Sequence, residues 1–347
     1  MRDCKNKVTL MTPCYNGEKF LSRWARCILN QDYGNIEIIF VNDGSTDRSE
    51  EIVFRFRENF IKKGYGFIYL KKENGGAASA IDFGLKHVTG DYLMLYDVDD
   101  IIMRNAVSEK ARYLDEHPDY GMVRNNGYYV KNKNLGQNSY LFITKRKEKK
   151  NEYIFDDIVF GRTNNWTASF MVRCKALWKC LGGRSIYVSP WGQNMQLMLP
   201  VAYFYKTGFI DIPLMRYVEH GNSVSRPGGF EKESALLDGY KENRIEIIRD
   251  IYMKEEEKRQ YFIDLEKMYA HIKLECAVRY HKKEKVSFFY SEIKSLNDLK
   301  LSDFMYYFFG RRKITVQLLV KVYAVKKMLW CVYHKIEGRI FRHDAIY

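Results

Sequence analysis

The first hundred residues alternate between short apolar runs and amphipathic stretches. The apolar runs lie at 8–11, 36–41, 67–70 and 92–96, and a polar loop follows each of them. Between them, apolar residues at helical spacing predict helices over 18–31, up to about 63, and over 77–87. This order predicts a doubly wound, mostly parallel α/β sheet. The polar loops then meet at the carboxyl edge of the sheet, where such folds bind ligands.

The fourth apolar run ends in three acids. Its residues show no alternation, which predicts a buried strand covered on both faces. Asp97 and Asp99, two residues apart in an extended chain, have Cα atoms roughly 6–7 Å apart and point the same way, so both carboxylates can approach one cation. Carboxylate oxygens favour Mg²⁺ or Mn²⁺, which proteins often bind together with substrate phosphates. The alternative for Asp97, Asp99 and Asp100 is a solvated acidic turn.

The pattern changes along the rest of the chain. Helices are expected over 104–117 and 175–181, and strands over 120–123, 167–172 and 209–214. The charge run at 145–150 is interpreted as a solvated loop. After residue 227 the composition shifts to charged helical sequence and then to apolar stretches. We therefore expect two domains, 1–226 and 227–347.

Composition and charge narrow the function class. A chain of 347 residues with 46% hydrophobic and 15% aromatic residues is expected to be globular. The net charge of +14 indicates an anionic partner, which could be nucleic acid, a membrane surface or phosphorylated substrates. Carboxylates at the expected crevice, without interleaved basic and aromatic residues, argue against nucleic acid. Because no apolar run is long enough to span a bilayer and no leader is evident, a cytoplasmic protein is expected.

Four polar motifs stand in register along the expected loops. They read Thr-Pro-Cys-Tyr-Asn at 12–16, Val-Asn-Asp-Gly-Ser-Thr-Asp at 41–47, Asn-x-Gly at 74–76, and Gly-Asp-Tyr-Leu-x-x-x-Asp-x-Asp-Asp at 90–100. In this order and spacing they resemble the family 2 glycosyltransferases. The resemblance implies a GT-A nucleotide-sugar domain, here with a C-terminal helical extension, and a divalent cation, Mn²⁺ or Mg²⁺, as cofactor.

The resemblance also implies a donor site. In the family, the positions of Pro13 and Tyr15 line the base pocket, and the position of Asp43 accepts a hydrogen bond from the base imide. Asp97 and Asp99 correspond to the metal and diphosphate motif. The further donor-site positions carried over to this chain are Asn16, Glu18, Ser45, Asn74, Gly76, Val98 and His220. Glu18 has a second interpretation, that of an acid at a helix N-terminus.

The chain departs from the family pattern in two places near the donor site. Ala80-Ile81-Asp82-Phe83-Gly84 stands where an Ala-Arg-Asn-x-Gly motif is common, so the arginine is missing. Asn42 replaces a common acid. Since Asp43, Asp97 and Asp99 remain, we interpret both changes as tuning of the donor pocket.

A third departure concerns catalysis. Gln193 and Asn194 stand where the family commonly has Glu-Asp, whose Asp is the general base. An amide cannot take up a proton at a useful pH. The segment resembles a subset of the family with Gly-Gln-Asn at this place, and the amides are expected to orient the acceptor. The alternative is a plain helix start, since Asn serves as an N-cap. Glu219 is a first guess for the missing base.

Two segments near the C-terminus carry further expectations. Residues 216–226 resemble the family's flexible lid, with His220, Ser223 and Arg226 closing on the diphosphate, although a lone histidine in a loop is often plain surface. Residues 314–336 predict a helix with a basic face and an apolar face, suited to an anionic membrane surface or to packing on the catalytic domain.

These observations lead to one expected function and its rivals. The chain is expected to be a metal-dependent hexosyl- or N-acetylhexosaminyl-type glycosyltransferase that uses a UDP-linked donor and inverts the anomeric carbon. Its acceptor is expected to be a saccharide or lipid-linked saccharide in surface polysaccharide or capsule synthesis, at the inner face of the plasma membrane. The first rival is a non-catalytic nucleotide-sugar-binding protein, suggested by the missing acid at Asn194. The second is a basic nucleic-acid-binding protein.

Overall fold

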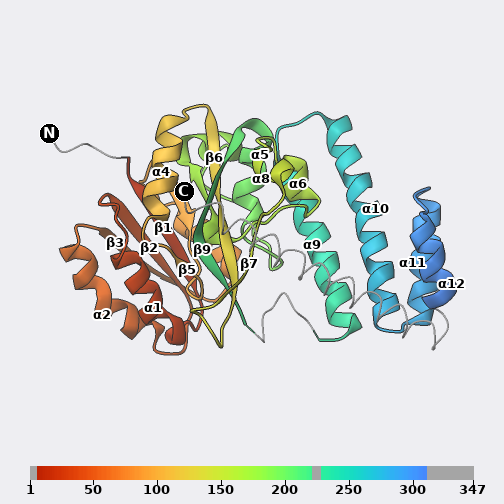
Figure 1. Cartoon of the computed structure of the whole chain (residues 1–347), viewed down its shortest axis with the longest axis horizontal. Helices are drawn as coiled ribbons and strands as arrows, with labels where there is room; N and C mark the ends of the chain where they lie inside the picture. The colour runs from red at the N-terminus through yellow and green to blue at the C-terminus, as the bar shows by residue number, and fades with distance from the viewer. Residues whose placement is uncertain (1–5, 221–227, 311–347) are drawn as a thin grey trace, which may run out of the picture. The chain divides into compact units, whose positions relative to one another are not determined.

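The chain divides into two compact units. The computed structural model describes residues 6–220 and 228–310, and Figure 1 colours them in chain order. The units are Met1–His220 and Gly221–Tyr347, each with its own hydrophobic core. This division lies close to the boundary expected after residue 226, and that boundary stays a prediction.

The first four strands of the N-terminal unit are parallel. The elements are β1 (Val8–Cys14), α1 (Glu18–Leu29), β2 (Ile36–Asp43), α2 (Ser49–Lys62), β3 (Gly66–Lys72), α3 (Ala77–Leu85) and β4 (Tyr92–Leu95). β1 pairs with β2 and β4, and β2 pairs with β3. In register, Cys14 lies opposite Asn42, and Asp43 lies opposite Lys72. The carboxyl ends of these strands therefore meet at one edge, as the order of elements predicts.

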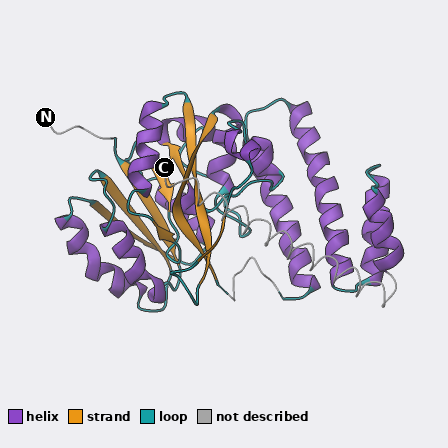
Figure 2. Cartoon of the chain, viewed as in Figure 1, coloured by secondary structure: helices purple, strands orange, loops and turns teal. Residues whose placement is uncertain are grey.

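The second half of the sheet is mixed. Its elements are β5 (Ile101–Ile102), α4 (Ala106–Glu116), β6 (Tyr120–Lys131), β7 (Asn138–Leu141), α5 (Arg146–Lys150), α6 (Phe155–Val159), the 3-10 helix η1 (Thr167–Ser169), β8 (Phe170–Arg173), α7 (Cys174–Leu181), α8 (Met195–Phe204) and β9 (Lys206–Glu219). The strand order is β3-β2-β1-β4-β8-β6-β9-β5, with β7 beside β6. β8 is antiparallel to both β4 and β6, while β6 and β9 are parallel. Figure 2 shows the strands as one twisted sheet with helices packed around it.

Three local predictions were wrong. The strand expected over 167–172 begins only at Phe170, because Ser169 donates from both its N–H and its Oγ to the carbonyl of Trp166 and closes a turn there. Residues 216–219, expected in a lid loop, extend β9, whose last residue Glu219 lies opposite Lys131 of β6. Of the charge run at 145–150, residues 146–150 form the short helix α5 instead of a loop, and Lys149 pairs with Asp211 at 2.6 Å.

Aromatic packing holds α1 and α2 on the sheet. The ring of Trp24 on α1 meets Phe40 of β2 edge-on at 5.3 Å and Phe60 of α2 at 5.9 Å. All three side chains are fully buried, and each such burial contributes about 2 kcal/mol. The indole N–H of Trp24 donates to Thr12 Oγ1, so this side chain also keeps its polar group paired. This packing holds α1 against β1 and β2, whose carboxyl ends contribute to the candidate site.

The C-terminal unit is helical. It contains α9 (Phe230–Asp250), α10 (Glu255–Arg279), α11 (Lys283–Ser295) and α12 (Leu301–Gly310). His271 of α10 lies between two acids, with Nδ1 2.9 Å from Asp303 and Nε2 2.7 Å from Asp298, and so ties α10 to the start of α12. Across the described ranges 6–220 and 228–310, every helix is too short or too polar to cross a bilayer. The basic apolar helix expected over 314–336 lies outside the described residues, as do Ser223 and Arg226 of the expected lid.

Candidate functional site

Three carboxylates gather where β4 ends. The strand Tyr92–Leu95 is buried along its whole length and delivers Asp97, Asp99 and Asp100 to the carboxyl edge of the sheet. One oxygen of each carboxylate lies within 4.8 Å of the others. Asp100 is the most buried of the three and accepts a hydrogen bond from the N–H of Val218 at 3.0 Å. We call these three residues the acidic cluster.

The acidic cluster is electrostatically strained. Burial, followed by the charge of Asp99, raises the pKa of Asp97 to about 7, while the neighbouring polar side chains of Thr167 and Gln193 partly offset this rise. Burial also raises the pKa of Asp100 well above its usual range, and the charges of Asp99 and Asp97 add to the rise. Carboxylates this close cannot all remain ionised without a positive charge among them. Because hard oxygen donors in this number suit a small divalent cation, the residues present fit Mg²⁺ or Mn²⁺.

Neighbouring side chains support the cluster. The Arg23 guanidinium on α1 donates to the backbone carbonyl of Asp99. His220 Nε2 lies 3.2 Å from Asp99 Oδ2, and its ring meets Phe20 edge-on at 5.2 Å. The predicted residue His220 therefore joins the predicted metal residue Asp99. Arg23 and Thr167 were not predicted, because neither belongs to a recognisable motif and only folding brings them to β4.

The Asp43 carboxylate is already partly occupied. Its Oδ1 accepts from Lys72 Nζ at 2.8 Å and from the N–H of Gly75 at 3.1 Å. Its Oδ2 accepts from the N–H of Gly76 at 2.8 Å. Asp43 thus fastens the loop that contains Asn74 and Gly76 to the end of β2. Lys72 is a further residue that the motifs did not indicate, although it is the last residue of β3, next to β2 in the sheet.

Backbone geometry explains two glycines of these motifs. Gly76 has a φ of +87° and directs its N–H at Asp43. Gly44 has a φ of +73°, and a Cβ there would lie 2.7 Å from the backbone nitrogen of Asn74. Any other residue at 44 would push Asn74 away from its place. Asn74 itself is exposed, and Val98 lies between the acids of the cluster, half-buried.

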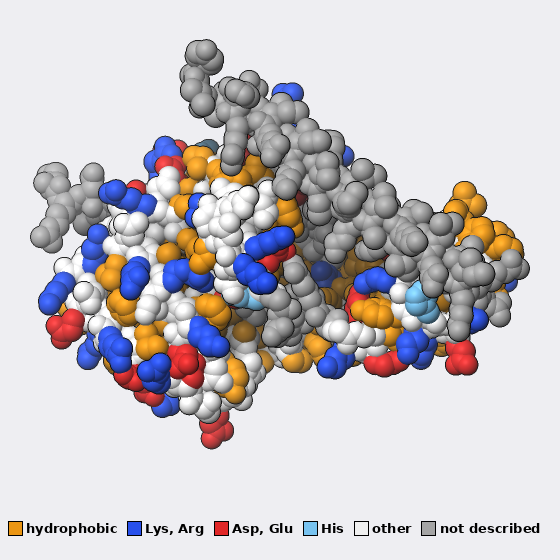
Figure 3. All heavy atoms as spheres, turned by 60° about the horizontal axis from the view of Figure 1, so that its bottom comes forward, with side chains coloured by type: hydrophobic (Ala, Val, Ile, Leu, Met, Phe, Trp, Pro, Cys, Tyr) orange, Lys and Arg blue, Asp and Glu red, His pale blue; other side chains and the backbone are white. Residues whose placement is uncertain are grey.

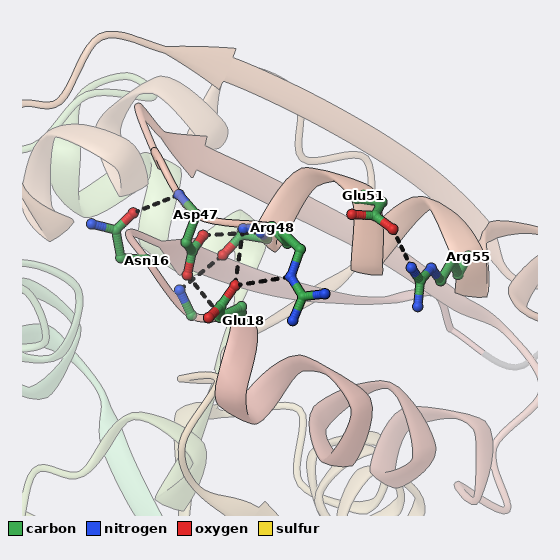
Figure 4. A network of polar contacts seen from close by, with 8 residues as sticks. Asn16, Glu18, Asp47, Arg48, Glu51 and Arg55 are labelled. Carbon is green, nitrogen blue, oxygen red and sulfur yellow. Dashed lines mark hydrogen bonds and ion pairs between the residues drawn. The ribbon is translucent and has the colours of Figure 1, made fainter.

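A polar network joins the first two loops of the sheet edge (Figure 4). Asn16 Oδ1 accepts from the N–H groups of Thr46 and Asp47, and the N–H of Asn16 donates to Ser45 Oγ. Asn16 and Ser45, two of the predicted donor-site residues, therefore hold the loop after β1 and the loop after β2 together. Asn16 adopts a φ of +52°, a conformation that asparagine tolerates better than most residues.

Glu18 belongs to the same network. Its Oε2 accepts from the N–H of Arg48 at 3.1 Å, just before α2 begins. Its own N–H donates to Asp47 Oδ2 at 3.0 Å, while Asp47 Oδ1 accepts from the N–H of Ser49 at 2.9 Å. The two acids thus satisfy N–H groups at the starts of both α1 and α2. This placement matches the helix-start interpretation of Glu18. Of the base-pocket positions, Pro13 is buried in β1 and Tyr15, just after β1, is 54% exposed.

The amides stand at the start of α8. Gln193 lies beside Asp97 and lowers its pKa. Asn194 occupies the N-cap position, but its side chain makes no capping hydrogen bond. Its Nδ2 instead donates to the carbonyl of Asn165 at 2.7 Å, and its Oδ1 is buried without a hydrogen-bond partner. Thr167, two residues after Asn165 and the first residue of η1, adjoins Asp97, so the amides and the acidic cluster face one region.

Asp82 replaces part of the family motif that this chain lacks. Its Oδ1 accepts from Ser185 Oγ at 2.6 Å and from the N–H of Ile186 at 2.9 Å. The residue therefore anchors the segment that leads to Gln193. Glu219, the expected base, is the last residue of β9, next to His220, and its carbonyl accepts from the N–H of Asn132.

Comparisons with known proteins agree with this arrangement. Residues 9–181 match the model of the family described as Glycosyl transferase family 2. The "Minor teichoic acid biosynthesis protein GgaB" of Bacillus subtilis (strain 168) is 35% identical over 111 residues, which are 31% of this chain and 12% of that protein. The chain spans less than two thirds of the length of the curated relatives that it matches.

Two solved structures share the fold. S. aureus TarS 1-349 in complex with UDP-GlcNAc has a TM-score of 0.57 at 16% identity, over 88% of this chain and 90% of that one. The mannosyltransferase PcManGT from Pyrobaculum calidifontis, in complex with GDP-Man and Mn²⁺, has a TM-score of 0.56 at 16% identity, over 97% and 87% of the two chains. The expected α/β fold of the GT-A type with C-terminal helices is confirmed.

Proposed function

Because the chain belongs to glycosyl transferase family 2, we propose that it transfers a sugar from a UDP-linked donor to a saccharide or a lipid-linked saccharide. The observation that carries the proposal is the acidic cluster at the carboxyl end of β4, on the same sheet edge as Asp43. A diphosphate can bind at that edge, beside a carboxylate that can accept a hydrogen bond from the nucleotide base. A hexosyl or N-acetylhexosaminyl donor is supported by TarS, whose structure contains UDP-GlcNAc.

The contacts of Asp43 favour uracil. A carboxylate offers about four lone-pair directions, and three are taken by Lys72, Gly75 and Gly76. The direction that remains is on Oδ2, enough for one N–H donor. Uracil presents a single imide N–H, whereas guanine presents two neighbouring donors that a carboxylate would bind with both oxygens. Lys72 is thereby a candidate for setting the preference for UDP.

Asp97 and Asp99 are proposed to hold the cation, with Arg23 and His220 fixing Asp99. When bound, a divalent cation supplies positive charge that offsets the charge of the departing diphosphate. The chain itself orients the carboxylates, through the Arg23 bond to the Asp99 carbonyl and the Val218 bond to Asp100. It also keeps Asp97 half-buried, away from bulk water, so that electrostatic interactions there are stronger than in solution.

The amides are proposed to bind the acceptor. Asn194 uses its NH₂ group on Asn165, so the free group is an oxygen that can accept a hydrogen bond from a sugar hydroxyl. Gln193 adjoins Asp97 and would lie between donor and acceptor. Since neither amide can take up a proton, we propose that the Glu219 carboxylate accepts the proton of the attacking hydroxyl. Inversion of the anomeric carbon is the outcome expected for one direct displacement.

The biological setting follows from the acceptor class. GgaB is named for minor teichoic acid biosynthesis, which supports a role for this chain in surface polysaccharide or capsule synthesis. We place the reaction at the inner face of the plasma membrane, where a lipid-linked acceptor and a nucleotide sugar can meet. An anionic membrane surface is then a partner of the protein.

One experiment separates the proposal from its rival. A panel of UDP-, GDP- and dTDP-sugars is screened for thermal stabilisation with and without Mn²⁺, since a ligand of the native state raises its melting temperature. We expect a UDP-sugar to stabilise the protein and Mn²⁺ to increase the effect. Hits are then incubated with saccharide and lipid-linked acceptors. Donor binding without transfer to any acceptor would favour the non-catalytic nucleotide-sugar-binding protein, and no binding at all would reject both.

A further inference from the structure

The short helix α5 separates its charges into two faces. Four of its five residues are basic, and the fifth is an acid. Successive residues of a helix are about 100° apart, so Arg146, Lys147 and Lys150 fall on one side, and Glu148 and Lys149 fall on the other. The first three side chains are exposed, whereas the other two are partly buried. We call Arg146, Lys147 and Lys150 the α5 basic face.

The two inward residues hold α5 on the N-terminal unit. Glu148 Oε1 accepts from Thr163 Oγ1 at 2.8 Å, and Thr163 Oγ1 accepts in turn from the buried Arg124 at 2.6 Å. Lys149 pairs with Asp211 of β9 at 2.6 Å. The α5 basic face takes no part in these contacts, since none of its three side chains pairs with an acid in the part of the chain that the structure describes. The helix is therefore anchored from one side and presents unpaired positive charge on the other.

Folding does not account for this concentration of charge. Arg146 and Lys150 are i, i+4 neighbours, and like charges at that spacing destabilise a helix. Arg146 is also the first residue of α5, where the helix dipole favours an acid. Figure 3 shows other Lys and Arg side chains scattered among residues of every kind, so a single exposed basic residue is common in this protein. Three unpaired basic residues on one side of a short helix instead form a positive surface that an anion can meet.

A short segment joins α5 to the acidic cluster. Thr163, which anchors α5, and Thr167, which adjoins Asp97, are four residues apart, so their Cα atoms are separated by at most about 14 Å. Between them, Asn164 has a side-chain oxygen that is buried without a hydrogen-bond partner, as Asn194 has. These oxygens can accept hydrogen bonds from hydroxyl groups. A saccharide chain whose end lies at the acidic cluster can therefore extend to the α5 basic face.

We propose that the α5 basic face binds anionic groups, phosphodiesters or carboxylates, of the saccharide acceptor. This inference rests on the proposed function, because it assigns a chemical class to the acceptor of the same site. Arginine binds either group with two parallel hydrogen bonds, and lysine binds it as a point charge. A membrane surface fits less well, since a helix that lies in a membrane needs an apolar face and α5 contains no apolar residue. The acceptor is then an acidic saccharide chain whose charged units contact α5.

The test measures saccharide binding to the full chain without donor. Dissociation constants are determined by calorimetry for an oligomer of glycerol phosphate, an oligomer of galacturonic acid and a neutral glucose oligomer of equal length. The basic-face variant is Arg146→Gln/Lys147→Gln/Lys150→Gln. The control variant, Arg57→Gln/Lys62→Gln/Lys63→Gln, removes one arginine and two lysines that are exposed in α2 and directly after it. A charge-retaining variant is Arg146→Lys/Lys147→Arg/Lys150→Arg.

We expect at least one anionic oligomer to bind and its dissociation constant to rise at least ~10-fold in the basic-face variant, on the scale of losing three exposed ion pairs. The control and charge-retaining variants are expected to change less than ~2-fold. Added salt is expected to weaken the binding to the unaltered chain, since it screens exposed charges. We also expect the amides of α5 in the unaltered chain to exchange more slowly when the anionic oligomer is added. These last two measurements hold even if the basic-face variant folds poorly.

Four outcomes overturn the inference. The first is that neither anionic oligomer binds, and the second is that the neutral oligomer binds equally well. The third is an equal loss of binding in the basic-face and control variants, because binding would then follow net charge alone. The fourth is a basic-face variant that binds the oligomers unchanged but no longer sediments with phosphatidylglycerol vesicles, which would assign the surface to a membrane.

The proposed transfer reaction is tested separately with the same oligomers and a UDP-sugar. An anionic oligomer that binds through the α5 basic face but receives no sugar would support the binding surface and contradict the proposed transfer. Transfer to the neutral oligomer alone, at the same rate in the basic-face variant, would support the proposed transfer and overturn the inference about the acceptor.

Discussion

Asn194 Nδ2 lies 2.7 Å from the carbonyl oxygen of Asn165, and this contact determines the orientation of the Asn194 side-chain amide. Only an NH₂ group can donate to a carbonyl, so Oδ1 must point the other way, where it is buried without a partner. The helix-start interpretation of Asn194 accounts for its position in the chain but not for this contact. A hydroxyl of the acceptor is the donor that we expect there.

Replacing Asn194 tests this assignment. Asn194→Ala is expected to raise the acceptor KM at least ~10-fold and to leave the pH profile of kcat unchanged, since an amide does not titrate. Asn194→Asp is expected to be slower still, because an ionised carboxylate cannot donate to Asn165. Steady-state kinetics between pH 6 and 9 give both results. A faster Asn194→Asp enzyme with a new ionisation would show that the oxygen is not used as we propose.

The metal assignment is tested at Asp99. Asp99→Ala is expected to abolish the Mn²⁺-dependent part of donor binding and to lower transfer at least ~100-fold, the scale of losing a main electrostatic stabiliser. Asp119→Ala is a matched control, because Asp119 is exposed and only weakly paired with Lys206 at 4.0 Å. Donor binding is followed by calorimetry with and without a chelator. If Asp99→Ala still transfers sugar and a chelator does not change its rate, the metal assignment is wrong.

Lys72 is expected to set the base preference. In Lys72→Met, Asp43 Oδ1 loses its charged partner and becomes available for a second N–H donor. We expect the ratio of dissociation constants for GDP and UDP to fall ~5-fold or more, on the scale of one hydrogen bond to a charged group. Lys71→Met is the control, because the neighbouring Lys71 pairs with Glu50 instead. If the ratio of the GDP and UDP dissociation constants is unchanged in Lys72→Met, Lys72 does not determine the base preference.

Lys110 is expected to give the protein a pH-dependent stability. Its side chain is fully buried, donates to Asn125 Oδ1 and to the carbonyl of Ala168 at 2.8 Å each, and has its pKa lowered to about 7 by burial. Between that value and the ordinary value near 10.5 the unfolded chain binds more protons than the folded one, so stability rises with pH.

The comparison is with Lys110→Met, which has no such titration. The free energy of unfolding of the unaltered chain is expected to rise by about 2 kcal/mol relative to Lys110→Met between pH 7 and pH 9. Urea unfolding followed by tryptophan fluorescence measures the difference. Parallel curves for the two proteins would mean that Lys110 stays charged in the folded state over this pH range, as it does in the unfolded chain.

The loop network is expected to contribute to stability. Asp47→Ala removes the acceptors for the N–H groups of Glu18 and Ser49, which start α1 and α2. Losing the two helix-start contacts is expected to cost about 1–3 kcal/mol. Asp47→Asn keeps one acceptor oxygen and should lose less. Arg55→Ala is a control on the exposed side of α2, where its partner is Glu51 (Figure 4). Equal melting temperatures for Asp47→Ala and Arg55→Ala would contradict this role.

The sequence by itself determined the order of strands and helices in the first hundred residues, since hydrophobic period and glycine-containing turns are local properties. It also determined that Asp97, Asp99 and Asp43 stand at the carboxyl ends of parallel strands, and that the amides at 193–194 cannot act as bases. These inferences need only the period of each element and the chemistry of each side chain.

Tertiary structure decided which partners those residues have. Several of these contacts depend on pairings between segments far apart in the chain. Lys72 binds Asp43, and Arg23 and His220 contact Asp99. The carbonyl of Asn165 orients the amide of Asn194. The late start of the strand expected over 167–172, at Phe170, and the continuation of β9 to Glu219 have the same origin. The Ser169 side chain closes the turn before β8, and pairing with β6 extends β9. Neither contact is encoded in the local hydrophobic pattern.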